Sequence, residues 1–274
     1  MKKYCRLVLL MLLLWGTVQT SAVAGSWSEI VYDREVPEQT RTNVQRAVDV
    51  TADLLTQYKI ALHKTITIIV TSDSESYAQA LMLYQKKTRP EVEETVKNSG
   101  GISLGSRPII LIKGTPRLQN SADEVFRVLP HEIFHQVQNQ YGKTNTVNWL
   151  KEGTPEVFRL VAQEKAGFGS VADNIRRAEE SIRRAATIPD TRQLAGSDYK
   201  VWSTMMAAYP IYPMAEVMAY RLIQDNGFEN VVFFYQLLHG GSAPDKAFLA
   251  AFRAPMSFFL ADMNDYFDKL RAKR

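Results

Sequence analysis

Five consecutive residues, His131-Glu132-Ile133-Phe134-His135, constrain the fold of this chain more than any other feature of its sequence. Residues four apart lie on one face of a helix, so a helix here brings both imidazoles toward one point. Two neutral imidazoles at this spacing are good ligands for Zn²⁺. Glu132 is then placed to accept a proton from water rather than to bind the metal. The segment therefore predicts a helix that carries a zinc site and a general base.

A catalytic zinc site also needs a third protein ligand and an open position for water. Residues 148–156 read NWLKEGTPE and offer two acids, Glu152 and Glu156. Glu152 follows the second histidine by 17 positions, which leaves room for a turn and a second helix that returns to the first. Pro155 is tolerated in the first turn of a helix and disrupts it further in. If Thr154 caps this helix, Glu152 lies just before it and Glu156 in its first turn, so Glu156 is an alternative ligand.

Together the two segments resemble the gluzincin metallopeptidases, and among them the bacterial peptidase-MA-like proteins. The pattern of that family is His-Glu-x-x-His followed by Trp-Leu-x-Glu-Gly, and the match in order of elements covers roughly residues 64–252. The resemblance implies His131, His135 and Glu152 as the ligands of one Zn²⁺ per chain. It also implies Glu132 as the general base. The family usually continues Glu-Gly-x-Ala, whereas a proline replaces that alanine here.

The tetrahedral intermediate of peptide hydrolysis carries an oxyanion, which a second hydrogen-bond donor must stabilise. Gluzincins take this donor, a Tyr or a His, from the helical half of the fold. Tyr212, in the segment YPIYPMAE at 209–216, resembles the tyrosine that opens the helix after the site in peptidase-MA-like proteins. The resemblance thus implies Tyr212 as a catalytic residue beside Glu132. Tyr209 and His239 are the alternatives, and both tyrosines can instead be core aromatics.

The order of the predicted elements indicates an α+β fold. Residues 65–70 are almost all β-branched and predict a strand, and 100–104 and 109–112 predict a hairpin. From Ser121 onward the periodic segments are helical, and Pro130 predicts a break or a bend just before the metal-binding histidines. We therefore expect a small sheet with an edge hairpin, a mainly helical half, and the metal site between them. Gluzincins bind the substrate backbone along an edge strand at this place, so the resemblance implies the same for one strand here; the alternative is an ordinary core hairpin.

The first 24 residues have the layout of a secretory signal peptide. Three basic residues precede an apolar run at 7–15, and Ala22-Val23-Ala24 forms a small-residue cleavage site. The run is shorter than the about 20 residues of a membrane-spanning helix, and an uncleaved anchor is the alternative. We therefore predict a signal segment at 1–24 and an exported, periplasmic or secreted, single catalytic domain at 25–274. Its α/β lobe is expected at 25–120 and its helical lobe at 121–274.

Net charge limits the partners of the exported part. Three of the 33 basic residues and none of the 29 acidic ones lie in residues 1–24, so the remainder has a formal charge of +1. This balance predicts neither a nucleic-acid partner nor stable membrane insertion after signal cleavage. Arg176-Arg177 and Arg183-Arg184 are separated by Glu179 and Glu180, which favours a solvated, self-paired helix face over an anion site.

These features predict an exported zinc metallopeptidase that acts on a peptide or protein substrate. Glu132 is expected to accept the proton of the attacking water and return it to the leaving amine. Two alternatives share the same site. One is a non-catalytic metal-binding or envelope-associated binding module, and the other is a zinc amidase that acts on cell-wall material.

Overall fold

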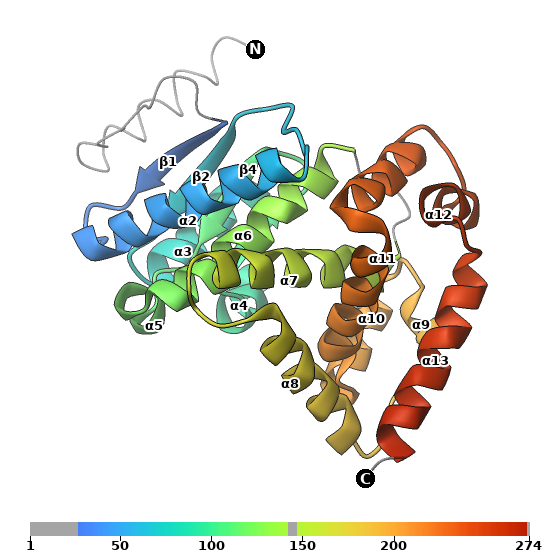
Figure 1. The fold of residues 1–274 in the computed structure, drawn as a ribbon. Helices are drawn as coiled ribbons and strands as arrows, with labels where there is room; N and C mark the ends of the chain where they lie inside the picture. The colour runs from blue at the N-terminus through green and yellow to red at the C-terminus, as the bar shows by residue number, and fades with distance from the viewer. Residues whose placement is uncertain (1–26, 142–146, 273–274) are drawn as a thin grey trace. The chain divides into compact units, whose positions relative to one another are not determined.

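The computed structural model describes residues 27–141 and 147–272, so the predicted signal segment at 1–24 lies outside the described residues. The chain forms two compact units. The first unit contains the residues up to Val48 together with Leu62–Glu132, and the second contains Asp49–Ala61 and the chain from Ile133 onward. Two helices, α2 (Glu38–Gln57) and α6 (Ala122–Asn139), continue from one unit into the other (Figure 1).

The first unit is built on a four-stranded sheet with the order β1-β2-β4-β3. The strands are β1 (Ser28–Tyr32), β2 (Ile66–Val70), β3 (Gly101–Leu104) and β4 (Ile109–Ile112). The pairs β1-β2 and β2-β4 are parallel, whereas β3 runs antiparallel to β4 with Ser103 opposite Ile110. The predicted strand and hairpin are therefore confirmed, and β3 is the last strand of the sheet order.

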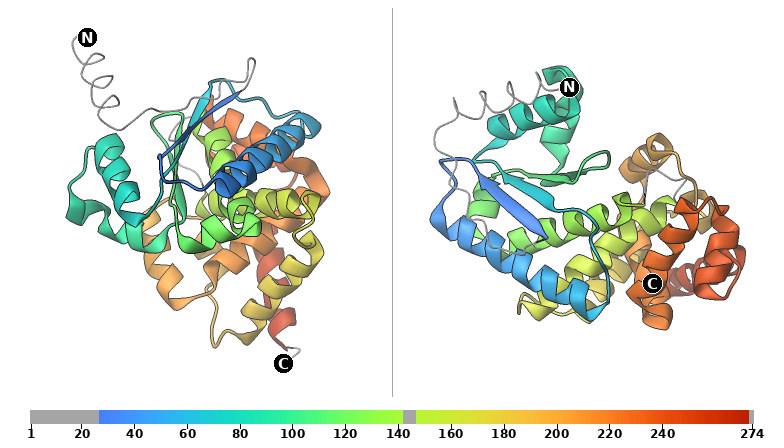
Figure 2. Two further views of the ribbon diagram at one scale, coloured as in Figure 1. Left: turned by 90° about the vertical axis from the view of Figure 1, so that its left-hand side faces the viewer. Right: turned by 90° about the horizontal axis from the view of Figure 1, so that it is seen from above.

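Helices cover both faces of this sheet. In both views of Figure 2, α3 (Ser74–Gln85) and α4 (Arg89–Asn98) lie on one face, with the first parts of α2 and α6 on the other. Successive residues of a strand point to opposite faces of the sheet. Leu111 packs with α3 and α4, whereas its neighbour Ile112 points toward the face that α6 covers. The short α5 (Pro116–Asn120) then leads into α6.

Helix α6 runs through Pro130 without interruption, so of the two expectations for this proline, a break or a bend, the break is wrong. The hydroxyl of Ser121 accepts a hydrogen bond from the N–H of Glu124 at 3.4 Å, as expected of the residue that precedes the helix. The Glu124 carboxylate forms ion pairs with Arg117 and Arg127. A proline inside a helix removes one backbone hydrogen bond, and the apolar residues of α6 offset this cost because they are buried: Val125, Phe126, Leu129, Ile133, Phe134 and Val137.

The second unit is helical in its described residues, which confirms the α+β class for the chain as a whole. Its helices are α7 (Asn148–Lys165), α8 (Val171–Arg184), α9 (Thr191–Leu194), α10 (Tyr199–Ala208), α11 (Ile211–His239), α12 (Pro244–Phe252) and α13 (Met256–Ala272). Phe134, Phe158 and Phe228 form an aromatic cluster, with ring centroids 4.9 to 5.8 Å apart. Helix α11 changes direction at Gly227, whose φ of 77° favours glycine.

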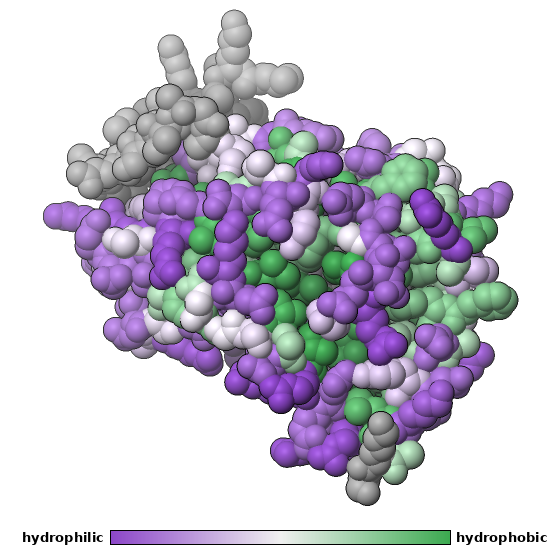
Figure 3. Space-filling view, viewed as in Figure 1, coloured by the Kyte–Doolittle hydropathy of each residue, from purple (hydrophilic) through white to green (hydrophobic). Residues whose placement is uncertain are grey.

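Hydrophilic residues dominate the face drawn in Figure 3, and hydrophobic residues are visible among them. Within the two described ranges, no helix combines the length and the apolar character that crossing a membrane requires.

Helices α7 and α11 approach so closely at Gly153 that no side chain fits there. A Cβ atom added to Gly153 would lie 2.2 Å from the carbonyl oxygen of Ala215 and 2.9 Å from the Ala219 side chain. The first of these atoms is backbone and cannot rotate away, so one helix would have to shift. This close approach of the two helices explains why a glycine follows Glu152.

We expect Gly153→Ala to lower the free energy of unfolding by about 1–3 kcal/mol, the usual cost of overpacking a well-packed interface. Gly196→Ala is the matched control, because the nearest atom to its added Cβ is 4.0 Å away. Denaturant unfolding of both variants measures the difference. Equal midpoints for the two variants would show that the α7–α11 contact has room for a methyl group.

Candidate metal site

Two histidines of α6 and one glutamate of α7 converge. The candidate ligand atoms of His131, His135 and Glu152 all lie within 4.8 Å of one another. Nε2 of His135 is 3.8 Å from Oε2 of Glu152. Both of these side chains are largely buried, with 13% and 7% of their surface exposed. The structure therefore brings together the three residues that the sequence predicts as ligands.

The start of α7 distinguishes between the two acids of the second motif. The helix begins at Asn148, so Glu152 lies inside it and Pro155 is an interior residue rather than the opening one. The interpretation in which Thr154 caps the helix is therefore wrong. Glu156, one turn further on, forms an ion pair with Arg159 instead. Of the two acids, Glu152 is the one that joins the histidines.

This donor set suits a zinc ion. Two imidazole nitrogens and one carboxylate oxygen are the usual ligands of a catalytic zinc site, which keeps its fourth position open. Tetrahedral ligands 2.0–2.1 Å from a common centre lie about 3.4 Å apart. Nε2 of His135 and Oε2 of Glu152 are 3.8 Å apart, which exceeds this value by a few tenths of an ångström, and the whole group lies within 4.8 Å, so the ligands would draw closer around an ion.

Glu132 lies beside the first histidine on α6 and is buried, with 8% of its surface exposed. Tyr77, on α3, has its pKa raised above the ordinary value by burial, and the negative charge of Glu132 adds to this rise. The Glu132 carboxylate is therefore largely shielded from water. A charge shielded from water acts more strongly on a neighbouring proton than an exposed charge does.

Tyr212 lies in the first turn of α11 and donates a hydrogen bond from its hydroxyl to Oε2 of Glu152, at 3.3 Å. Burial raises its pKa well above the ordinary value, and the negative charge of Glu152 raises it further, so the phenol stays protonated at neutral pH. The ring of Trp202 packs edge-on against it at 5.9 Å.

The two alternative oxyanion donors, Tyr209 and His239, make other contacts. Tyr209 is the residue that ends α10, and its N–H bonds to the carbonyl of Met205. His239 lies at the far end of α11, where its Nδ1 is 2.7 Å from the carbonyl oxygen of Tyr141. Of the three candidate donors, Tyr212 is thus the one with a hydrogen bond to a member of the candidate metal-binding group.

A largely buried ionic cluster lies one helical turn beyond the candidate site. Arg159 of α7 pairs with Glu156 and lies 3.6 Å from Glu216 of α11. Glu216 is buried, and this burial raises its pKa to about 7 even though the positive charge of Arg159 opposes the rise. Sequence analysis missed this cluster, because no local pattern pairs Arg159 of α7 with Glu216 of α11, a residue far along the chain.

The raised pKa of Glu216 predicts how stability depends on pH. Because the folded protein holds this proton more tightly than the unfolded chain, its contribution to stability is complete below about pH 4.5 and is lost as pH rises to about 7. Relative to Glu216→Gln, we expect the wild-type free energy of unfolding to fall by about 3 kcal/mol across this interval, at 1.36 kcal/mol for each unit of pKa. Denaturant unfolding at several pH values measures this difference, and a constant difference would contradict it.

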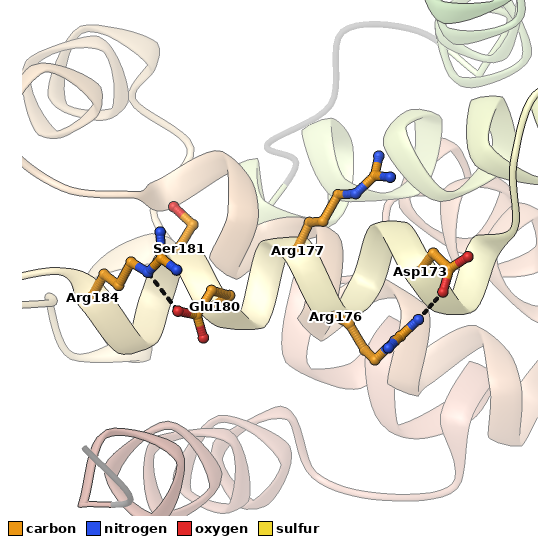
Figure 4. Close-up of a pocket in the computed structure, with 6 residues that line it drawn as sticks. All are labelled: Asp173, Arg176, Arg177, Glu180, Ser181 and Arg184. Carbon is orange, nitrogen blue, oxygen red and sulfur yellow. Dashed lines mark hydrogen bonds and ion pairs between the residues drawn. The ribbon is translucent and has the colours of Figure 1, made fainter.

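A surface hollow on α8 is a separate feature. Its lining residues all belong to that helix: Asp173, Arg176, Arg177, Glu180, Ser181 and Arg184. Arg176 pairs with Asp173, and Arg184 pairs with Glu180 (Figure 4). The predicted pairing is confirmed for Glu180, which pairs with Arg183 and Arg184, whereas Glu179 accepts a hydrogen bond from the hydroxyl of Tyr266.

The fold and the site define a mainly helical α+β protein with a His-His-Glu group that can hold a metal ion. No protein-family model matches the chain, and no curated protein matches it. Among solved structures, it is similar to the crystal structure of an aminopeptidase N family protein from Idiomarina loihiensis, with a TM-score of 0.55 and 11% sequence identity. The match covers 90% of this chain and 46% of that chain, so this chain spans less than half the length of that structure. At this identity the likeness is one of fold.

Proposed function

We propose that this chain is an exported zinc metallopeptidase of the gluzincin type, similar to the peptidase-MA-like proteins. The observation that carries the proposal is the convergence of His131, His135 and Glu152 beside the acid Glu132. The similarity in fold to an aminopeptidase N family protein supports a peptidase. Export rests on the signal-like residues 1–24, and the low net charge of the remainder supports a peptide or protein substrate rather than nucleic acid.

Two imidazoles and one carboxylate would hold the zinc ion, which when bound lowers the pKa of a water and polarises a substrate carbonyl. Glu132 accepts the proton that the attacking water loses and delivers it to the leaving amine, so the reaction adds one water across the peptide bond. Tyr212 keeps its phenolic proton and donates a hydrogen bond to the oxyanion of the tetrahedral intermediate. This assignment requires the hydroxyl to turn from Glu152 to the substrate oxygen.

The substrate backbone is proposed to pair with the outer edge of β3. This strand is the last in the sheet order, and Gly101 at its start packs against Val128, three residues before His131 on α6. Main-chain hydrogen bonds along an edge strand bind an extended peptide without selecting its sequence. Such binding favours unfolded or extended substrates over compact ones.

Metal removal tests the proposal. The purified protein without residues 1–24 should contain one zinc per chain and cleave denatured casein or members of a peptide library. Because the bound ion would lower the pKa of the attacking water and polarise the substrate carbonyl, treatment with a chelator should abolish cleavage and added Zn²⁺ should restore it. Cleavage that survives complete zinc removal would contradict the proposal. Bound zinc without cleavage of any peptide would assign the chain to a binding module, and cleavage confined to cell-wall material would assign it to an amidase.

A further inference from the structure

A buried amide links the second histidine of α6 to the helix that carries Glu152. Gln138 lies in the last turn of α6 with 4% of its surface exposed. Its amide nitrogen donates to the carbonyl oxygen of Lys151 at 3.0 Å and to the hydroxyl oxygen of Tyr235 at 3.1 Å. Its amide oxygen lies 2.7 Å from Nδ1 of His135.

The orientation of this amide follows from its partners. A backbone carbonyl oxygen can only accept hydrogen bonds, so the NH₂ end of Gln138 must face Lys151. The oxygen end must then face His135, and that oxygen also can only accept. The proton of the 2.7 Å contact therefore belongs to Nδ1 of His135. Rotating the amide by half a turn would place two acceptor oxygens against each other at the Lys151 carbonyl, so that contact excludes the rotated orientation.

Pro155 supplies the acceptor on which this orientation depends. In a regular helix the carbonyl of Lys151 accepts from the N–H of the residue four positions later, which here is a proline without an N–H. Gln138 donates to that carbonyl instead. Pro155, which departs from the Glu-Gly-x-Ala pattern, thus leaves a carbonyl without its helical donor, and Gln138 of α6 supplies a donor in its place.

We propose that Gln138 is a positioning residue that, through the Lys151 carbonyl left open by Pro155, holds His135 in the tautomer protonated on Nδ1. A neutral imidazole carries one N–H, so this tautomer leaves Nε2 with its lone pair, and Nε2 is the atom 3.8 Å from Glu152. The choice of donor atom rests on the proposed metal site. The tautomer itself does not, because the chain's own hydrogen bonds select it.

Nitrogen NMR of the metal-free protein tests the tautomer directly. With ¹⁵N-labelled histidine, at a pH where the imidazole is neutral, the long-range ¹H–¹⁵N spectrum should show the proton of His135 on Nδ1. A His135→Gln variant assigns the signal among the four histidines of the chain. In Gln138→Met the acceptor is gone, so the signal should move to the Nε2–H form or to exchange between the two forms.

Zinc affinity gives the second readout. Orienting partners of metal ligands contribute about 10–100-fold to metal affinity, and Gln138→Met should lose an amount in this range. Pro155→Ala adds an N–H that competes for the Lys151 carbonyl, so it should mix the tautomers and weaken zinc binding by less than Gln138→Met. Tyr235→Phe is the matched control: it also removes a buried hydrogen bond of Gln138 but leaves the Lys151 contact, so the Nδ1–H signal should persist.

Each outcome bears on one claim. Wild-type His135 protonated on Nε2, or a pure Nδ1–H signal in Gln138→Met, would overturn the role of Gln138 whatever the protein binds or cleaves. Identical spectra and zinc affinity for Pro155→Ala and the wild type would overturn the part assigned to the proline. If His135 is protonated on Nδ1 but the protein binds no zinc, the role of Gln138 in orienting His135 is supported and the proposed function is contradicted.

Discussion

Glu132→Gln should reduce peptide cleavage by about 10²–10⁴-fold while the protein keeps its zinc. The size of the loss is that of a general base, because the amide cannot accept the proton of the attacking water. The zinc content should be unchanged, since the His-His-Glu group that can hold the ion does not include Glu132. Steady-state cleavage of a peptide by the variant, together with metal analysis of the same sample, measures both effects.

Glu124→Gln is the matched control for this experiment. Glu124 is also a buried acid of α6, and it pairs with Arg117 and Arg127 two turns before the histidines. The control variant is expected to keep full activity, although it loses part of an ion pair. Wild-type cleavage by Glu132→Gln would remove Glu132 from the mechanism. Loss of zinc from that variant would instead place Glu132 among the ligands.

Glu152→Gln should weaken zinc binding by more than about 100-fold, whereas Glu156→Gln should keep it. Partners that merely orient a ligand contribute up to about 100-fold, so the loss of a charged ligand should exceed that figure. Glu156 pairs with Arg159 one turn away from the group, and its neutralisation leaves the three candidate ligands in place. Competition with a chelator of known affinity measures both variants.

The two acids would exchange roles if Thr154 capped α7 and Pro155 opened it, instead of the helix beginning at Asn148. In that case Glu156→Gln loses zinc and Glu152→Gln retains it. This pair of variants therefore tests the start of α7 as well as the identity of the third ligand. Circular dichroism of both variants excludes unfolding as the cause, because a ligand substitution should leave the helical signal unchanged.

Much of the fold follows from short stretches of sequence. The β-branched run at β2, the hairpin β3-β4 and the helical spacing of α6 each depend on residues that are contiguous, so their positions are predictable. Proline is a weaker guide to helix boundaries. Pro130 predicts a break or a bend in α6, and Pro155 allows a helix that opens there, yet both lie inside continuous helices. Burial of the surrounding apolar residues offsets the lost backbone hydrogen bond, and at Pro155 Gln138 also donates to the carbonyl left open.

Sequence alone determined that two imidazoles share one helix face with an acid between them, because a spacing of four residues is a property of the helix itself. Tertiary structure decided the rest of the site. Glu152 rather than Glu156 joins the histidines because α7 begins at Asn148, and Gly153 lets α11 approach until Tyr212 bonds to Glu152. The partners of Gln138 are likewise 13 and 97 positions away. Contacts between residues so far apart depend on how whole helices pack, and no local pattern encodes that packing.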